Sequence, residues 1–316
     1  MFLVLPGFLA LAYSFAFARD FQEPLIYSVL AVGFIESGHV YTTFWRTYLH
    51  PDERNSSRIY VVVPLVIFGV FTIWMFFGRI GMWSFVAYAN VFHHVRQYYG
   101  FNRWYQGLGA KPSRVSDFFL YALCLVPIVA YHFRSDAIKG YYSNDDLFLA
   151  PHPIAFAACV GLFGVVAFAW IVFEIRRWSA GAREPGRVLS ILTPAAIYSI
   201  CFFYGTTLTT ILFPLVISHG VAYFGVMGES LRKTQSARFP TFVRAVTIVI
   251  GTAVVLGGSE FYFEQNWIDF TDVGPSGSGV ASLVTGLYLV PLFSHFVFDA
   301  IIWRRKHRES RLMMVS

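Results

Sequence analysis

Long apolar stretches recur along the whole chain, and short polar segments separate them. A helix of about 20 apolar residues spans the hydrocarbon layer of a bilayer. The pattern predicts ten such spans, with bounds near 2–18, 24–45, 59–78, 80–99, 116–134, 153–174, 188–205, 206–228, 241–259 and 279–303. We therefore expect an all-α fold, a polytopic transmembrane helix bundle of about ten spans, which forms a single integral membrane domain over residues 1–316.

The amino-acid composition agrees with a membrane protein. Apolar residues make up 56% of the chain and charged residues 13%, whereas soluble domains carry roughly one quarter charged residues. The cysteines Cys124, Cys159 and Cys201 all fall inside predicted spans and lack the spacing of a zinc site, so we expect them to pack as small apolar side chains. The lipid bilayer is thus the expected main partner of the chain.

Basic residues mark one side of the predicted bundle. The connections after the second, fourth, sixth and eighth spans, together with the C-terminal tail, carry 20 of the 24 Lys and Arg residues. Because cytoplasmic segments are rich in Lys and Arg, we expect both termini in the cytoplasm, in a multi-pass protein of the bacterial inner (plasma) membrane. The opposite side carries acidic loops, one of them from Glu260 to Asp272. The net charge of +6 is therefore an orientation signal, and no nucleic-acid partner is expected.

Histidines inside the predicted spans are the candidate functional residues. Five of them belong to even-numbered spans, which run toward the cytoplasm: His39, His93, His94, His219 and His295. At a rise of about 1.5 Å per residue, each lies roughly 10 to 20 Å from the basic residues at the cytoplasmic end of its helix. Ionisable groups inside a membrane are costly and normally face the interior of a bundle. We therefore expect these histidines to converge in one layer and to bind a metal ion.

Carboxylates accompany two of the histidines at helical spacing. Glu36 precedes His39 by three residues, and Asp299 follows His295 by four, so each pair shares one helix face. A metal-bound imidazole usually donates its other N–H to a carboxylate or a carbonyl. We therefore expect Glu36 and Asp299 either to orient the ligands or to bind the metal directly.

Three further residues are candidates for catalytic roles. Tyr98 follows His94 by four residues, Tyr223 follows His219 by four, and Arg96 lies in the same segment as Tyr98. We expect Arg96 and Tyr98 to line the mouth of the site. Tyr223 is expected to donate either a proton or only a hydrogen bond.

The fourth span contains two adjacent histidines, and the sequence leaves open which of them binds the metal ion. His93 and His94 point about 100° apart on a helix, so both can bind one ion only if the helix is distorted, and two metal ions would use them more naturally. The spacing to Tyr98 slightly favours His94, which leaves His93 as a further ligand or as a supporting group. His50 is expected in a solvated turn. No role in the site is expected for His132, His152 and His307.

Three runs of sequence carry a resemblance to known proteins: GHVYTTFWRTY at 38–48, HHVRQYYG at 93–100 and SHFVFDAIIW at 294–303. They resemble a broad group of uncharacterised polytopic bacterial membrane proteins with intramembrane histidine motifs. More distantly, the layout is similar to the bacterial β-carotene dioxygenases related to bacteriorhodopsin gene clusters, membrane enzymes that hold iron with histidines from several helices. The chain lacks that family's paired H-G-x-x-D-H opening motif, and it lacks the H-x-x-x-H and H-x-x-H-H boxes of membrane desaturases and hydroxylases.

The leading hypothesis is a histidine-ligated membrane metalloenzyme, an oxidoreductase of the oxygenase type. Non-haem iron would activate oxygen against a hydrophobic substrate, lipid- or isoprenoid-like, at the cytoplasmic side. Imidazole ligands suit iron, copper and zinc alike, so the metal stays open. One alternative is an ion or proton transporter in which the histidines and carboxylates form a relay. The other is a b-type haem protein with two axial histidines.

Overall fold

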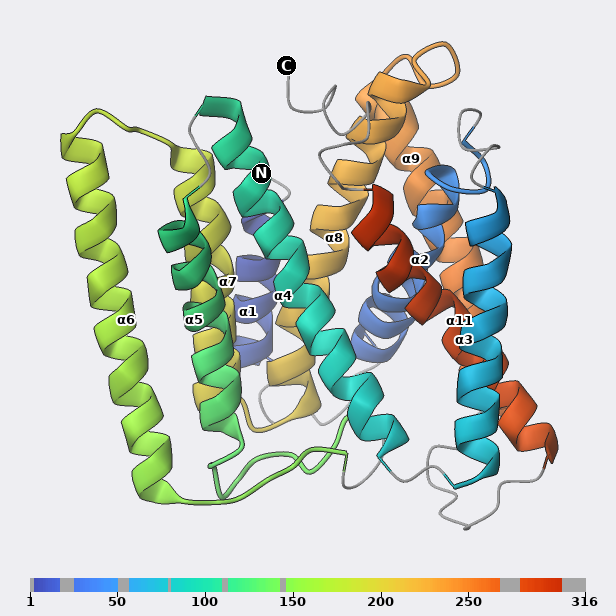
Figure 1. Cartoon of the computed structure of the whole chain (residues 1–316), viewed down its shortest axis with the longest axis horizontal. Helices are drawn as coiled ribbons and strands as arrows, with labels where there is room; N and C mark the ends of the chain where they lie inside the picture. The colour runs from blue at the N-terminus through green and yellow to red at the C-terminus, as the bar shows by residue number, and fades with distance from the viewer. Residues whose placement is uncertain are drawn as a thin grey trace. The chain divides into compact units, whose positions relative to one another are not determined.

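Figure 1 shows a computed structural model of the protein, which describes residues 3–17, 26–50, 57–78, 81–109, 113–142, 146–267 and 279–302. Within these ranges every regular element is a helix. Seven of the described helices are long and apolar enough to cross a membrane by length and composition. The all-α fold expected from the sequence is confirmed, and so is the presence of several helices apolar enough to span a bilayer.

The described helices follow one another along the chain. In chain order they are α1 (Leu5–Phe17), η1 (Ile26–Ser37), α2 (Gly38–Thr42), η2 (Thr43–Trp45), α3 (Ser57–Phe76), α4 (Met82–Gly109), α5 (Arg114–Tyr131), α6 (Pro153–Ser179), α7 (Pro185–Tyr204), α8 (Leu208–Thr234), α9 (Phe242–Thr252), η4 (Ala253–Gly257), α10 (Gly258–Trp267) and α11 (Gly279–Ile302). The segments η1 and η4 are π-helical, and η2 is a 3₁₀-helix. Each predicted span coincides with one of these helices or with an unbroken series of them.

One loop prediction was wrong. The sequence placed Glu260 and the residues after it in an acidic loop, but α10 continues to Trp267. Glu260 and Glu264 lie one turn apart on α10, where the hydroxyl of Tyr41 hydrogen-bonds Glu260 and that of Tyr288 donates to Glu264 at 3.1 Å. Because each carboxylate has a tyrosine hydroxyl as a hydrogen-bond partner, both can be accommodated in a helix that continues past the apolar residues. The predicted basic tail from residue 304 lies outside the described residues.

The predicted turn at Gly205 separates α7 from α8. The backbone N–H of Thr207 donates to the hydroxyl of Thr210 at 3.0 Å, and the N–H of Thr210 donates to the hydroxyl of Thr207 at 3.2 Å. This reciprocal capping satisfies two N–H groups at the start of α8. A Cβ atom at Gly205 would lie 2.4 Å from the carbonyl oxygen of Cys201, so the close approach of the chain requires glycine there.

The chain divides into two compact units, each made of two segments. The first unit comprises residues 1–24 and 86–219, and the second comprises residues 25–85 and 220–316. The continuous helices α4 and α8 each contribute residues to both units. The single domain expected from the sequence stays a prediction.

In the first unit, α5, α6 and α7 lie side by side, green to yellow in Figure 1. Trp170 and Glu174 are the buried residues of α6, and its remaining side chains are largely apolar and exposed. Such a surface suits contact with lipid. α1 packs against α7 and α8 at Gly7, where a Cβ atom would lie 2.5 Å from Ile197 and 2.7 Å from Ser218.

In the second unit, α3 and α11 lie side by side, and η1 and α2 cross η4. The crossing uses two glycines. A Cβ atom at Gly257 would lie 2.5 Å from the Cα atom of Gly38, so the two backbones touch. π-Helical turns are rare and frequently lie at functional sites. This crossing fixes the start of α2, the short helix that carries His39.

Candidate metal centre

Two histidine rings meet at right angles in the second unit. His39 lies on α2 and His295 on α11, and the two side chains are 1% and 0% exposed. Their ring centroids are 4.9 Å apart, and the ring planes are 86° apart. The lone pair of an imidazole nitrogen lies in the plane of its ring, so perpendicular rings can each direct one nitrogen at a shared point. The pair can therefore supply two ligands to one metal ion.

The hydrogen bond of His39 selects one of its ring nitrogens as the ligand. Its Nδ1 lies 3.0 Å from the backbone carbonyl oxygen of Ile35, one turn earlier. A carbonyl oxygen only accepts hydrogen bonds, so Nδ1 carries the ring proton in this contact. Nε2 then holds the lone pair that a metal ion needs.

Two hydroxyl groups and a carboxylate adjoin His295. Thr43 Oγ1 lies 2.7 Å from His295 Nδ1 and 3.0 Å from the Tyr223 hydroxyl. Tyr223 donates a hydrogen bond to Asp299 at 2.8 Å. Its ring also packs edge-on against both histidines, with centroids 5.7 Å from His39 and 5.2 Å from His295. The sequence paired Asp299 with His295 directly, but their nearest atoms are 3.7 Å apart, beyond a hydrogen bond.

The remaining candidate histidines lie on α4 and α8. The ring of His93 is 5.2 Å from that of His219 at an interplanar angle of 74°, whereas the ring of His94 stacks on His219 at 3.9 Å and 15°. Stacked rings have parallel lone pairs that cannot meet at one ion, while crossed rings can converge. The geometry therefore favours His93 as the ligand beside His219, where the sequence slightly favoured His94. The side chain of Gln97 ties α4 to α8 by donating to the His219 carbonyl oxygen at 2.9 Å.

The helix α8 carries His219 and also Tyr223, which packs against the pair His39 and His295. His219 and Tyr223 are one turn apart on the same face of this continuous helix. Four buried histidines form a group that could hold a metal ion: His39, His93, His219 and His295. Four neutral nitrogen donors suit iron, copper or zinc.

Tyr98 and Arg96, which the sequence placed at the mouth of the site, both belong to the first unit. Tyr98 is 1% exposed and packs beside Ser218, in the interior of the first unit. Arg96 is exposed, its guanidinium lies 4.5 Å from the ring centroid of Tyr99, and it donates to the hydroxyl of Tyr121 at 2.7 Å. Tyr98 is thus packed inside the first unit, and Arg96 is held by aromatic side chains on its surface. Their role at the mouth of the site stays a prediction.

Glu36 lies among other carboxylates of the second unit. It precedes His39 by one turn, at the end of η1, and it interacts electrostatically with Glu260 on α10. Glu260 in turn interacts with Glu264. Glu36, which the sequence assigned to the metal site, thus also belongs to a group of three interacting carboxylates with Glu260 and Glu264.

The histidines outside the site have other roles. His132 Nδ1 lies 2.7 Å from the carbonyl oxygen of Ile128, and its Nε2 lies 2.7 Å from the hydroxyl of Tyr88, which donates to it. His152 caps the N-terminus of α6. His50, which was expected in a solvated turn, is 2% exposed, so that prediction was wrong.

Thr43 is the residue of the site that the sequence reasoning missed. It follows His39 by four residues, the same spacing that singled out Tyr223 and Asp299. Threonine hydroxyls in helices commonly bond their own backbone, as Thr42 does by donating to the His39 carbonyl oxygen at 2.7 Å. The sequence alone therefore gives no reason to choose Thr43 over Thr42.

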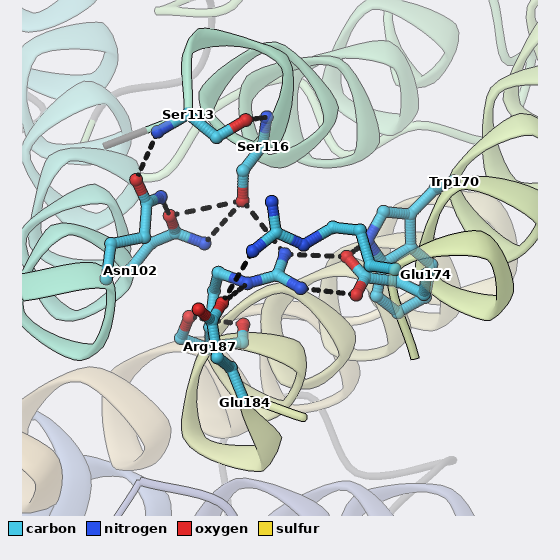
Figure 2. A network of polar contacts seen from close by, with 10 residues as sticks. Asn102, Ser113, Ser116, Trp170, Glu174, Glu184 and Arg187 are labelled. Atoms are coloured by element: carbon cyan, nitrogen blue, oxygen red, sulfur yellow. Dashed lines mark hydrogen bonds and ion pairs between the residues drawn. The ribbon is translucent and has the colours of Figure 1, made fainter. Parts of the chain in front are cut away.

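A separate buried polar network lies in the first unit and centres on Arg187 (Figure 2). The Arg187 guanidinium is fully buried; it pairs with Glu174 through both terminal nitrogens and with Glu184 through Nε at 2.6 Å. Glu184 also pairs with Arg177 at 3.1 Å. Two arginines and two glutamates thus balance one another, which is typical of a network that holds helices together.

Comparison with known proteins gives no family for the chain: no family model, no curated protein and no solved structure matches it.

Proposed function

We propose that the chain is an integral-membrane metalloenzyme whose metal ion is held by His39, His93, His219 and His295. The observation that carries the proposal is the orientation of the buried rings in two crossed pairs, 86° and 74° between planes. Crossed rings allow the in-plane lone pairs of two imidazoles to converge on one ion, which a stacked pair does not. A metal ion gives these otherwise costly polar groups a common partner inside the membrane.

We propose non-haem iron as the metal and an oxygen-dependent oxidation as the reaction. Zinc has no redox chemistry, whereas iron and copper do. Bound iron would supply the binding and reduction of oxygen. The resemblance of the histidine-bearing runs to iron-holding membrane dioxygenases supports iron over copper. The residues of the chain would hold the metal, fix its ligands and keep water out of the buried site.

The proposed substrate is hydrophobic, lipid- or isoprenoid-like, and enters from the bilayer. Apolar side chains of α3 and α6 are exposed along these helices, among them Leu65, Ile73 and Phe168. A substrate dissolved in the membrane can reach such surfaces without passing through water.

We further propose ten spans, with both termini cytoplasmic in the bacterial inner (plasma) membrane, because 20 of the 24 basic residues lie on one side under that topology. Reporter tags at the two termini test this, and an external C-terminus would refute it.

Elemental analysis of the detergent-purified protein, combined with its absorption spectrum, tests the metal centre. About one iron per chain without a Soret band is the expected result. A Soret band would instead indicate haem, and stoichiometric zinc would exclude redox chemistry at the metal. Absence of any stoichiometric metal after reconstitution with iron, copper or zinc salts would refute the proposal.

The second candidate function is an ion or proton transporter, and one observation favours it. Glu36, Glu260 and Glu264 form a series of interacting carboxylates in the second unit, with Tyr41 and Tyr288 bonded to two of them. Carboxylates in a membrane commonly mark proton or ion pathways. Proton flux into proteoliposomes that the Glu260→Gln variant abolishes, in protein without bound metal, would support this candidate over the enzyme.

A further inference from the structure

A series of short polar contacts leads from a carboxylate to a histidine within the second unit. It runs from Asp299 on α11 to Tyr223 on α8, then to Thr43 on η2, and returns to His295 on α11. The three distances are 2.8, 3.0 and 2.7 Å. Tyr223, Thr43 and His295 are buried, at 3%, 1% and 0% exposure, so water does not compete for these hydrogen bonds.

The number of hydrogens in the series fixes its direction. An ionised carboxylate only accepts, and tyrosine and threonine hydroxyls each carry one hydrogen. Tyr223 uses its hydrogen on Asp299. In the Thr43–Tyr223 contact, the donor must therefore be Thr43. Since the single hydrogen of Thr43 is then used, the contact between Thr43 and His295 requires a hydrogen on His295 Nδ1.

We infer that Thr43, Tyr223 and Asp299 hold His295 as the Nδ1–H tautomer, so that the lone pair is on Nε2. Thr43 is a positioning residue, because its hydroxyl contacts Nδ1 of His295, and the proposed ligand atom is the other ring nitrogen, Nε2. His39 obtains the same tautomer from the carbonyl oxygen of Ile35. Both rings of the crossed pair thus present Nε2, one oriented by its own helix and the other by side chains of two other segments.

The carboxylate acts on the ring through two hydroxyl groups. Each donor in a directed series polarises the next one, so the negative charge of Asp299 makes the His295 imidazole a stronger electron donor without touching it. This role of His295 as a ligand rests on the proposed metal centre. The tautomer itself does not, because it follows from the hydrogen-bond count in the metal-free protein.

The tautomer is tested first, in metal-free protein. Solid-state nitrogen NMR of protein with isotopically labelled histidine distinguishes a protonated Nδ1 from a protonated Nε2, and the His295 signals are assigned by their absence from the His295→Asn variant. We expect the proton on Nδ1. A proton on Nε2 would overturn the inference whether or not the protein binds metal.

Substitutions then test the series itself. Tyr223→Phe leaves the Thr43 hydrogen free to point at His295 Nδ1, so the proton should move to Nε2. Thr43→Val removes the hydroxyl at nearly constant volume, whereas Thr43→Ser keeps it and is the matched control. In metal-competition titrations, Thr43→Val and Tyr223→Phe should lower affinity about 10- to 100-fold, as loss of groups that orient ligands does.

The outcomes separate this inference from the proposed function. If Thr43→Val binds metal as tightly as the parent protein, or if Thr43→Ser is as weak as Thr43→Val, Thr43 does not position the ligand and the inference is wrong. If the parent protein binds no metal but His295 shows the Nδ1–H tautomer that Tyr223→Phe reverses, the series is real and the metalloenzyme proposal fails.

Discussion

The two buried polar regions, the Arg187 network and the histidine site, differ in how their groups are satisfied. In the Arg187 network, arginine guanidinium groups form ion pairs with glutamate carboxylates, so the charges of this region are balanced by residues of the protein itself. In the histidine site, the hydrogen-bond contacts of His39 and His295 engage Nδ1 of each ring, and the two rings lie perpendicular with centroids 4.9 Å apart. A region that balances its own charges stabilises the fold, whereas a region that gathers several imidazole nitrogens suits the metal ion that we propose.

Removal of a ligand should have the largest effect. The variants His39→Ala, His219→Ala and His295→Ala should each lose most bound metal, because four neutral donors cannot be replaced by water at equal affinity. The folded yield should fall little, since no charge is left unpaired. Metal content by elemental analysis is the measurement. His132→Ala and His152→Ala are the controls and should keep their metal; stoichiometric metal in all three ligand variants would remove the support for this assignment.

Breaking the Arg187 network should lower the free energy of unfolding and leave the amount of bound metal unchanged. Arg187→Ala leaves Glu174 buried without its cation, which destabilises a protein by about 3–5 kcal/mol. The double variant Glu174→Leu/Arg187→Leu should be milder, because the remaining Glu184 keeps Arg177 at 3.1 Å. Unfolding in detergent compares the two. A double variant less stable than Arg187→Ala would contradict the view that balanced charge is what this network contributes.

Asp299→Asn should have an intermediate effect on metal affinity. The amide oxygen can still accept from Tyr223, so the direction of the series survives while its negative charge is lost. Affinity should fall about 10- to 100-fold. A metal-competition titration against the parent protein measures it. Unchanged affinity, with a slightly more stable helix, would reduce Asp299 to a carboxylate that extends toward the membrane surface.

Ser116→Ala should have the smallest effect. Its hydroxyl contacts Arg187 at 3.3 Å and Asn102 at 3.4 Å, and both distances are long for hydrogen bonds. Hydrogen bonds between membrane helices contribute about 0.6 kcal/mol on average. The free energy of unfolding should therefore change by no more than about that amount. A loss as large as that of Arg187→Ala would show that the neutral residues of the network matter as much as its charges.

The sequence could predict the helices because span length is a local property. Apolar runs located the turn at Gly205 and nearly every helix, and one error concerned Glu260, where two tyrosines from other helices stabilise carboxylates that the pattern assigned to a loop. The histidines were also found from the sequence, since their position along each helix follows from residue count alone.

Contacts between helices could not be predicted in the same way. The spacing to Tyr98 favoured His94, but the angle between ring planes favours His93. Ring angles depend on how α4 packs against α8, and no periodicity along one helix records them. Likewise, Thr43 and Thr42 are equivalent in the sequence, and the 2.7 Å contact with His295 distinguishes them.

By itself, the sequence determined that this protein is helical, apolar and rich in histidines within its helices, because hydrophobic length and residue type act within each segment. The tertiary structure decided which histidines cross, that a threonine and a tyrosine connect Asp299 to His295, and that the Arg187 charges pair with each other. Direction and distance between side chains of different helices are set by packing, and packing exists only once the helices have come together.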